Sequence, residues 1–262
     1  MFVFANDKER LYQHFQKDPV LFAYHIGDLD DFFFPQCQWA ASYTTRRHPI
    51  VQDVVLIYHG GKIPTVMAFG VQSGYADLLA ETLDILPDHF FCHFQQDCQP
   101  VLADQYDIEP LGTHMKMKCE TVGRSAQSGE PYLFTVTSTD LPELEVFYQK
   151  AYPENYFMPR MLDTGWYRGI RINGKIAAVA GVHVVSDQYK IAVLGNIATD
   201  PAHRGRHLAT RVTGGLTNEL YRQGKLVCLN VKADNAVAIK CYERLGFATV
   251  HSYEEALCRR RA

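Results

Sequence analysis

The clearest pattern in the chain is a change of hydrophobic period near residue 200. An apolar run ends at Asp200-Pro201, as expected of a buried strand, and a short basic turn follows. Beyond the turn, apolar residues recur every four positions and predict a helix that continues to about Gln223; they are Leu208, Val212, Leu216 and Leu220. This part of the chain is therefore predicted to form a strand, a turn and a helix.

A second strand and helix follow. Residues 226–231 are apolar and predict a short buried strand, and Asp234-Asn235 precedes a predicted helix as its cap. Asn235, Ala238 and Tyr242 are spaced three and four apart, so they lie on one face of that helix.

Shorter elements are predicted in the first part of the chain. Residues 2–4 predict an edge strand, and Asp7 is a candidate N-cap for a helix that contains Leu11 and Phe15. Residues 28–35 combine acidic side chains with three phenylalanines. They either line an amine-binding surface or pack in an interdomain or core contact.

Two hairpins with Gly-Lys turns suggest an internal duplication, although such hairpins also recur by chance. The first joins residues 54–58 to 65–71 and the second joins residues 165–172 to 176–185. Later segments correspond as well, residues 89–94 to 226–231 and residues 108–117 to 248–257. Because residues 121–131 are polar and rich in small side chains, they predict a linker between domains at 1–122 and 131–262.

Composition narrows the class of protein. A chain of 262 residues with 47% hydrophobic residues has enough core for two domains. The net charge is −3 and the basic residues are scattered apart from residues 259–261, so we expect no nucleic-acid partner. Seven cysteines without a C-x-x-C pair, no signal-like N-terminus and no apolar run of about 20 residues predict a reduced cytoplasmic protein with no membrane partner.

The basic turn before the first predicted helix has the chemistry of a phosphate-binding site. Arg204, Gly205 and Arg206 precede the helix N-terminus, where unpaired N–H groups and the positive end of the helix dipole favour an anion. A solvated helix cap is the alternative interpretation. His203 and His207 are four apart, but no carboxylate or cysteine lies nearby, so we predict no metal site.

Two motifs in order resemble the GNAT superfamily of acyl-CoA-dependent N-acetyltransferases. Arg204-x-x-His207-x-Ala209 resembles its [RQ]-x-x-G-x-[GA] signature, with His207 in place of the first glycine. Asn-x-x-Ala-x-x-x-Tyr from Asn235, followed by Leu-Gly-Phe247, resembles its second acetyl-CoA-binding segment. The resemblance covers residue 132 to the C-terminus. It implies an α/β fold with a mixed sheet, in which acetyl-CoA binds where two neighbouring strands splay apart.

The resemblance also implies which residues bind the cosubstrate acetyl-CoA. These are Ile197, Ala198, Thr199, Arg204, Gly205, Arg206, His207, Leu208, Ala209, Asn230, Asn235 and Ala238. The N-terminal half would be a degenerate GNAT-like copy in a tandem arrangement. At the position of its phosphate turn, residues 72–79 include Asp77 and no basic residue, so we expect no coenzyme there.

The implied reaction is direct attack of a neutral amine on the thioester of acetyl-CoA in a ternary complex. Backbone N–H groups at the end of residues 193–199 would polarise the carbonyl, and Gly195 would permit the bulge that exposes them. Tyr242 is the candidate acid for the departing thiolate, unless it is only a core aromatic.

The base and the acceptor surface are less defined. No carboxylate lies on residues 192–194, so His183 is the candidate base, with Asp187, Glu154, His251 or a water chain as alternatives. Tyr152, Tyr156 and Phe157 either shape the acceptor site or pack against the N-terminal half.

Three functions fit this sequence. The first is N-acetyl transfer to a primary amine of a small molecule, amino acid or peptide. The second is transfer of a longer acyl chain, because the paired halves resemble the glycine N-acyltransferase type. The third is a non-catalytic acyl-CoA sensor, which the absent strand carboxylate leaves open. The sequence predicts no oligomeric state.

Overall fold

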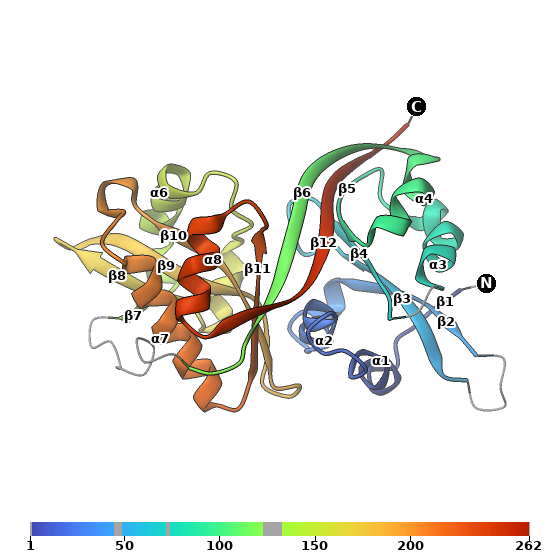
Figure 1. Ribbon diagram of the computed structural model, residues 1–262, viewed down its shortest axis with the longest axis horizontal. Coiled ribbons are helices and arrows are strands. Elements are labelled where there is room, and N and C mark those ends of the chain that lie inside the picture. Colours follow the sequence, from blue (N-terminus) through green and yellow to red (C-terminus); the bar gives the residue numbers. More distant parts are fainter. Residues whose placement is uncertain (1, 45–48, 72–73, 123–132, 262) are drawn as a thin grey trace. The chain divides into compact units, whose positions relative to one another are not determined.

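The computed structural model describes residues 2–44, 49–71, 74–122 and 133–261. The chain divides into two compact units, unit 1 with Met1–Lys116 and His251–Ala262, and unit 2 with Met117–Val250 (Figure 1). Both divisions fall inside strands, β6 (Tyr106–Cys119) and β12 (Phe247–Arg260). The end of β12 belongs to unit 1 because Glu254 to Arg259 pair with β5 (His89–Phe94). The sequence predicted one domain at 131–262; most of the predicted linker lies outside the described residues.

Unit 1 is a mixed sheet with short helices. Its elements before β5 are β1 (Val3–Phe4), α1 (Lys8–Phe15), α2 (Ala23–Asp28), β2 (Cys37–Tyr43), β3 (Val51–Tyr58), β4 (Thr65–Phe69) and α3 (Tyr75–Thr82), and α4 (Gln99–Ala103) follows it. Strands β1 to β4 pair antiparallel in order, and β4 pairs parallel with β5. Asp7 caps α1, as predicted, by accepting a hydrogen bond from the N–H of Arg10.

The phenylalanine-rich segment of unit 1 packs inside it. Phe33 is buried, and the ring of Phe34 stacks on that of the buried Trp39 at a centroid distance of 6.0 Å. Of the two interpretations of residues 28–35, these contacts support packing rather than an amine-binding surface.

Unit 2 contains the predicted strand, turn and helix. Its elements before β12 are β7 (Phe134–Thr135), α6 (Leu141–Ala151), β8 (Arg168–Ile172), β9 (Lys175–Ser186), β10 (Ile191–Thr199), α7 (Leu208–Arg222), β11 (Leu226–Lys232) and α8 (Ala236–Arg244). Strands β7 to β10 pair antiparallel, and β10 pairs parallel with β11. The four leucine and valine positions that predicted α7 are all buried, which confirms the mixed α/β fold. No described helix is both long enough and apolar enough to span a bilayer.

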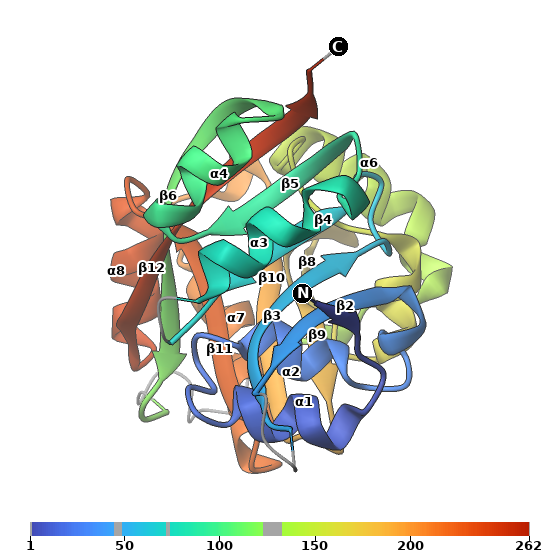
Figure 2. The same cartoon turned by 90° about the vertical axis from the view of Figure 1, so that its right-hand side faces the viewer.

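Both units place a helix between two parallel strands. In unit 1 the order is β4, α3, β5 (Figure 2), and in unit 2 it is β10, α7, β11. This topology matches β4 with β10. The Gly-Lys hairpins matched β4 with β9, so that correspondence is wrong by one strand. The physical reason is that hairpin turns of similar composition join many antiparallel pairs, whereas the parallel crossover is specific to one position in the fold.

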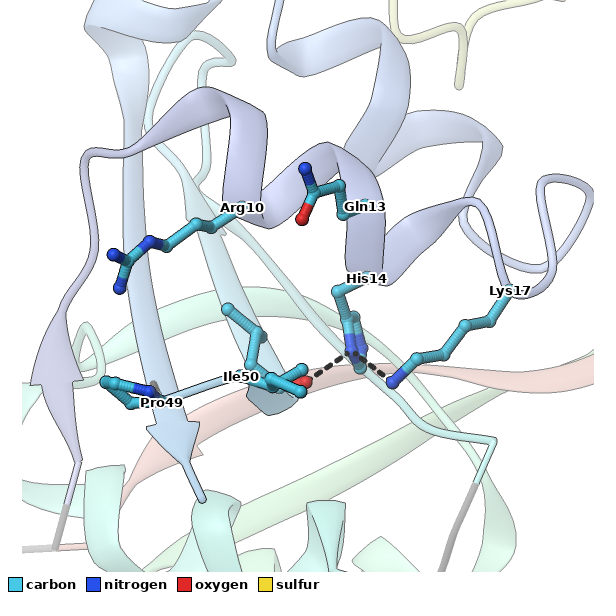
Figure 3. A pocket seen from close by; sticks show the side chains of 7 residues that line it. Arg10, Gln13, His14, Lys17, Pro49 and Ile50 are labelled. Atoms are coloured by element: carbon cyan, nitrogen blue, oxygen red, sulfur yellow. Dashed lines mark hydrogen bonds between the residues drawn. The ribbon is translucent and has the colours of Figure 1, made fainter. Parts of the chain in front are cut away.

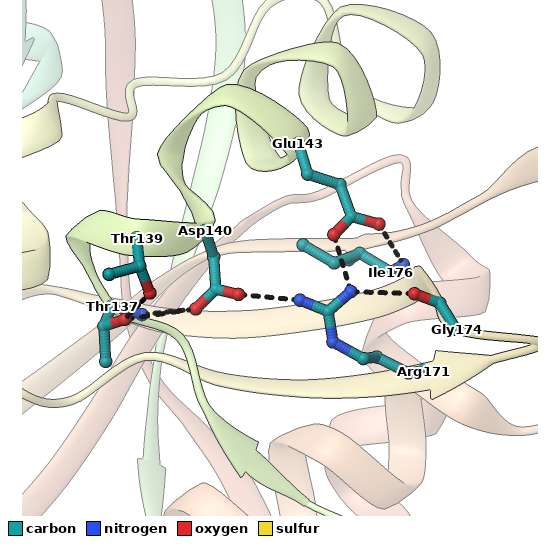
Figure 4. A network of polar contacts seen from close by, with 7 residues as sticks. All are labelled: Thr137, Thr139, Asp140, Glu143, Arg171, Gly174 and Ile176. Atoms are coloured by element: carbon teal, nitrogen blue, oxygen red, sulfur yellow. Dashed lines mark hydrogen bonds and ion pairs between the residues drawn. The ribbon is translucent and has the colours of Figure 1, made fainter.

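A polar network joins the start of α6 to the β8–β9 hairpin (Figure 4). The guanidinium of Arg171 donates to Asp140 Oδ1 at 2.7 Å and to Glu143 Oε2 at 2.5 Å, and Glu143 Oε1 accepts from the N–H of Ile176 at 2.8 Å. Burial raises the pKa of Glu143, but the hydrogen bonds from Arg171 and Ile176 outweigh it and hold that pKa below its ordinary value. The network therefore fixes α6 against the sheet of unit 2.

We predict that Arg171→Met lowers the free energy of unfolding by about 1–2 kcal/mol, because both carboxylates lose a charge-assisted partner while the aliphatic stem is kept. Urea unfolding measures the change. Arg222→Met, in the last turn of α7, is the matched control and should cost less than about 0.5 kcal/mol.

The same variant should show a pH dependence. Because the folded pKa of Glu143 is depressed, its stabilisation is present above its unfolded pKa and is lost as the pH falls through the folded value. The difference between parent and Arg171→Met should therefore shrink in acid. A difference that stays constant from neutral to acidic pH would contradict the role of this pair.

Candidate functional site

Strands β10 and β11 part from each other before either ends. They pair in parallel from Ile191 and Leu226 as far as Leu194 and Leu229. Strand β10 continues to Thr199 and β11 to Lys232. Beyond Leu194 the edge of β10 that faces β11 is no longer part of the parallel ladder. Strands β10 and β11 therefore form the splayed pair that the resemblance implied.

The alternation of antiparallel hydrogen bonds tells which amides of β10 face the opening. The N–H of Asp200 donates to Ala177 of β9 at 2.9 Å, and Thr199 lies opposite Ala178. Since bonded and non-bonded pairs alternate, the backbone groups of Thr199 point away from β9. Ala198 points toward β9. Of the three predicted strand positions, Thr199 therefore presents its backbone groups to the opening, whereas Ile197 lies within the irregular part of the register.

A bulge distorts β10 at the start of the opening. The register with β9 shifts between Gly195 and Ala198, and Asn196 has a left-handed backbone with φ of 53°. Gly195 does not have positive φ; an added Cβ there would overlap the ring of His183. The bulge is thus where the sequence placed it, but its left-handed residue is Asn196. A Gly-Asn pair inside an apolar strand was the available signal, because asparagine tolerates this conformation.

His183 lies in a second bulge, on β9. Val184 pairs with Val193 and Val182 with Leu194, which leaves His183 as the extra residue. Its ring packs against Gly195 and lies 5.9 Å from the ring of Tyr156. Burial lowers the pKa of His183 to about 4. The ring is therefore next to the β10 bulge and neutral at pH 7, but it is a weak base.

The turn between β10 and α7 exposes its backbone. Gly205 has φ of 76° and His207 has φ of 57° and ψ of 22°, both left-handed. His207 is the N-cap of α7, and its side chain makes no capping hydrogen bond. Its carbonyl accepts the N–H of Arg211, so the amides of residues 208–210 have no acceptor within the helix. This helix start can bind an anion.

Charged side chains around the turn leave it positive. Arg204 donates to the carbonyl of Ala151 at 3.3 Å, and Arg206 lies 3.4 Å from Nδ1 of His203. Asp200 is paired with Lys150 at 2.9 Å, so its charge is compensated. Within the described residues, no group of three or more His, Cys, Asp or Glu side chains is placed to hold a metal.

Polar groups on the parted strands and on α8 fit an amide-bearing ligand. Asn230 Nδ2 on β11 and Thr199 Oγ1 on β10 are buried without a hydrogen-bond partner in the described part of the chain. Asn235 caps α8 by accepting the N–H of Ala238 at 3.1 Å. The amide of Ala238 is thereby used, whereas the Asn235 NH₂ group remains as a donor.

Tyr242 is a buried residue of α8, 9% exposed, and its ring contacts Phe247 edge-on at 6.2 Å. Burial, and then the neighbouring Cys241 and Tyr152, raise the pKa of its hydroxyl above the ordinary value. The hydroxyl is protonated at neutral pH. These observations fit both a proton donor and a packed aromatic.

Two of the other candidate bases are paired with charged side chains. His251 pairs with Asp18 of unit 1 at 2.8 Å, and Asp187 accepts a hydrogen bond from Lys225 before β10 begins. Glu154 is exposed in the segment after α6.

Of the three aromatic residues considered for the acceptor site, Phe157 packs in the core of unit 2 instead. Phe157 is buried and packs on Tyr148 and Tyr167 at 5.3 and 5.6 Å, so it belongs to the core of unit 2. Tyr152 is 40% exposed. Tyr156 lies beside His183, as noted above.

The corresponding region of unit 1 is filled by its own side chains. The N–H of Gly70, just after β4, donates to Gln95 Oε1 at 2.9 Å, and the ring of Tyr75 packs so close to Gly70 that a Cβ would not fit. The Tyr75 hydroxyl bonds Asp97, beyond β5. Residues 72 and 73 of the predicted acidic turn lie outside the described residues. The amide that follows β4 is thus bonded within unit 1, whereas the N-cap of α3, Gly74, makes no side-chain capping hydrogen bond.

A pocket of about 350 Å³ lies elsewhere in unit 1 (Figure 3). Its lining includes Arg10, Lys17 and His14, whose Nδ1 lies 3.2 Å from the Val51 carbonyl. Burial and Lys17 lower the pKa of His14 to about 4. None of the residues predicted to bind acetyl-CoA lines this pocket.

Comparison with known proteins points to one family. Residues 132–247 match the Acetyltransferase (GNAT) family. The chain is 35% identical over 118 residues to the [ribosomal protein bS18]-alanine N-acetyltransferase of Escherichia coli K12, covering 43% of this chain and 78% of that protein. The protein of the same name from Salmonella typhimurium is 33% identical over 117 residues, with 43% and 77% covered.

Solved structures share the fold over nearly the whole chain. A Drosophila protein matches with a TM-score of 0.70 at 14% identity, over 98% of this chain and 97% of its own. A GNAT-family acetyltransferase from Colwellia psychrerythraea matches with a TM-score of 0.60 at 14% identity, over 99% and 100%. At this identity the likeness concerns the fold alone.

We predict that His207→Gly leaves the protein at least as stable as the parent, because glycine adopts the left-handed cap without the cost of about 1 kcal/mol that an L side chain has there. His207→Val should lower the free energy of unfolding by about 1 kcal/mol or more, since β-branched residues fit this conformation worst. Thermal unfolding compares the two. Equal loss in both variants would show that the histidine side chain, not the backbone, matters.

Proposed function

The chain belongs to the GNAT acetyltransferase family, and from this premise we propose that unit 2 moves the acetyl group of acetyl-CoA to a primary amine by direct attack in a ternary complex. The observation that carries the proposal is the opening between β10 and β11 beside the N-terminus of α7, whose N-cap residue makes no side-chain capping hydrogen bond. An extended, amide-bearing ligand with a polyphosphate at one end fits these two features together.

The cosubstrate would bind mainly through backbone groups. The amides of residues 208–210, with Gly205, Arg204 and Arg206, would hold the pyrophosphate. Thr199 and Asn230 would bond the pantetheine amides, since each has a buried polar atom without a partner in the described ranges. Asn235 would contribute its NH₂ group from the start of α8.

The reaction would need a hydrogen-bond donor to the thioester oxygen and a proton donor to the departing thiolate. The amide of Ile197 would donate to the thioester oxygen and stabilise the negative charge that develops there. The amine nitrogen would form a bond to the carbonyl carbon and lose one proton to solvent while the carbon–sulfur bond breaks. The thiolate would take the proton of the Tyr242 hydroxyl, and the tyrosinate would recover a proton from solvent. Burial raises the pKa of that phenol, so the hydroxyl is protonated at neutral pH and available to donate.

The amine must arrive neutral or lose its proton at the site. With its pKa lowered to about 4, His183 would serve as a hydrogen-bond acceptor that orients the amine more than as a strong base. The proton would then pass to solvent. Peptide α-amines suit this arrangement, because their pKa of about 8 leaves a sizeable neutral fraction near neutral pH.

A protein or peptide N-terminus is therefore the acceptor that we favour. The curated relatives from Escherichia coli and Salmonella are named for acetylation of an alanine of ribosomal protein bS18. A small-molecule amine is the alternative within the same reaction. A longer acyl chain and a non-catalytic sensor remain the other two candidates, and thiol release across acyl-CoA chain lengths with an amine panel separates all of them.

Unit 1 would be a degenerate GNAT-like copy that binds no coenzyme and serves the acceptor. Its helix-between-parallel-strands topology supports the common origin. The contact of Gly70 with Gln95 supports the loss of binding, because it uses a backbone amide just after β4, and the Tyr75 hydroxyl places Asp97, an anion, near the start of α3.

We predict that Gly205→Asp reduces acetyl-CoA affinity by at least about 100-fold, because it places a carboxylate at the pyrophosphate site. Gly174→Asp is the matched control: both glycines are left-handed, with φ of 76° and 77°, and neither has an atom within 4 Å of an added Cβ. Titration calorimetry should find normal binding in the control. Equal affinity in the two variants would refute the assignment of this turn.

We predict that Tyr242→Phe lowers kcat by about 10²–10⁴-fold with little change in the Kd of acetyl-CoA, because only proton transfer is lost. Tyr106→Phe, at a buried tyrosine of unit 1, is the control for the loss of a buried hydroxyl. If Tyr242→Phe instead turns over within about threefold of the parent at every pH, Tyr242 is a core aromatic and solvent protonates the thiolate.

A further inference from the structure

Asn196 holds an unusual backbone conformation in the middle of a buried strand. Of the described non-glycine residues with positive φ, Asn173 and Lys190 precede or follow hairpin strands and His207 caps a helix. Asn196 alone among these lies within a strand, and it is 3% exposed. A left-handed residue there costs about 1 kcal/mol and persists only when its surroundings hold it.

Two buried tyrosines hold Asn196 in this conformation. The hydroxyl of Tyr148, on α6, donates to the carbonyl oxygen of Asn196 at 2.7 Å. The Asn196 side chain donates through Nδ2 to the hydroxyl of Tyr167 at 2.9 Å, and Tyr167 in turn donates to the carbonyl of Val182 at 3.2 Å. Tyr148 is 2% exposed and Tyr167 is 0% exposed. The asparagine is therefore fixed through both its backbone and its side chain.

The same contacts connect the two bulges of unit 2. Val182 directly precedes His183, the extra residue of β9, and Asn196 is the left-handed residue of β10. Gly181 and Gly195 lie opposite each other, and an added Cβ would overlap the ring of Tyr167 at the first and the ring of His183 at the second. Both glycines are thus needed for the rings that fix the bulges.

The contact of Tyr148 with Asn196 determines the direction of an amide proton. In a trans peptide the C=O of one residue and the N–H of the next point in opposite directions within one plane. The hydroxyl that holds the Asn196 carbonyl therefore also orients the N–H of Ile197. Under the proposed function, on which this inference rests, that N–H polarises the thioester carbonyl.

We propose that Tyr148, Asn196 and Tyr167 are positioning residues that set the polarising amide of Ile197, and that Tyr148 controls turnover without touching the substrate. A donor that is preoriented does not have to reorganise as charge develops on the carbonyl oxygen. Losing the hydroxyl of Tyr148 frees the peptide plane between Asn196 and Ile197. Binding of the coenzyme at α7 does not depend on that plane.

Tyr148→Phe tests the proposal, because it keeps the ring and removes only the donor to Asn196. We expect kcat to fall by about 10-fold or more, while the Kd of acetyl-CoA stays within about twofold. Tyr221→Phe, on the exposed part of α7, is the control. A purely structural role would lower the melting temperature and leave kcat per folded molecule unchanged, and that result would overturn the proposal.

Infrared spectroscopy of bound ¹³C-labelled acetyl-CoA gives a second readout that does not need turnover. The thioester C=O band should shift to lower frequency in the parent and return toward the free value in Tyr148→Phe. Equal band positions in parent and variant would overturn the positioning role. A parent that polarises the carbonyl but transfers no acetyl group would instead contradict the proposed function and leave the positioning role supported.

Asn196→Gly keeps the left-handed backbone but loses the hydrogen bond to Tyr167. Full kcat in that variant would show that Tyr167 does not help to position the amide of Ile197.

Discussion

The candidate site depends on backbone hydrogen bonds that β10 does not make with its parallel neighbour. Strands β10 and β11 pair only as far as Leu194 and Leu229, and both continue beyond that point. A strand edge that is left out of a ladder must satisfy its amides elsewhere, with water, side chains or a ligand. In unit 2 the edge opens beside an uncapped helix start, so one elongated ligand can satisfy both.

The opening is maintained by side chains that are not themselves part of it. The rings of His183 and Tyr167 require glycine at two facing positions, and the hydroxyl of Tyr148 holds the left-handed residue. Network contacts around Arg171 fix the start of α6, the helix that carries Tyr148. Packing and hydrogen bonding in the core of unit 2 therefore determine the geometry of backbone groups at its edge.

Unit 1 has the same strand-helix-strand topology with different contacts at the corresponding positions. It has the helix between two parallel strands, yet Gln95 accepts the amide of Gly70, and Tyr75 and Asp97 bond to each other across the start of α3. The Gln95 side chain thus takes a backbone amide at the end of β4. No change of fold is needed for this, because substitutions next to the parted strands are sufficient.

Much of unit 2 could be predicted from the sequence because its signals are local. The four-residue spacing from Leu208 predicts α7, and Asn235 predicts the start of α8; the structure confirms both. Gly195 was predicted to permit the bulge, but the left-handed residue there is Asn196, and the ring of His183 on the neighbouring strand is what requires the glycine.

Other features of the chain depend on long-range pairing that no local pattern reveals. The match of β4 with β9 failed for this reason, and the return of β12 to unit 1 was missed because it follows from pairing with β5. The contacts of Tyr148 and Tyr167 with Asn196 join segments 48 and 29 residues apart. The left-handed conformation of His207 could not be predicted either, because the motif alone does not specify the backbone angles at the glycine position.

Hydrogen exchange with and without acetyl-CoA tests the central claim most directly. The account predicts slower exchange of amides at the end of β10 and in the first turn of α7, with no change in β4 and α3 of unit 1. Protection in β4 and α3 instead, or protection in neither unit at saturating acetyl-CoA, would contradict the claim that the parted strands of unit 2 form the coenzyme site.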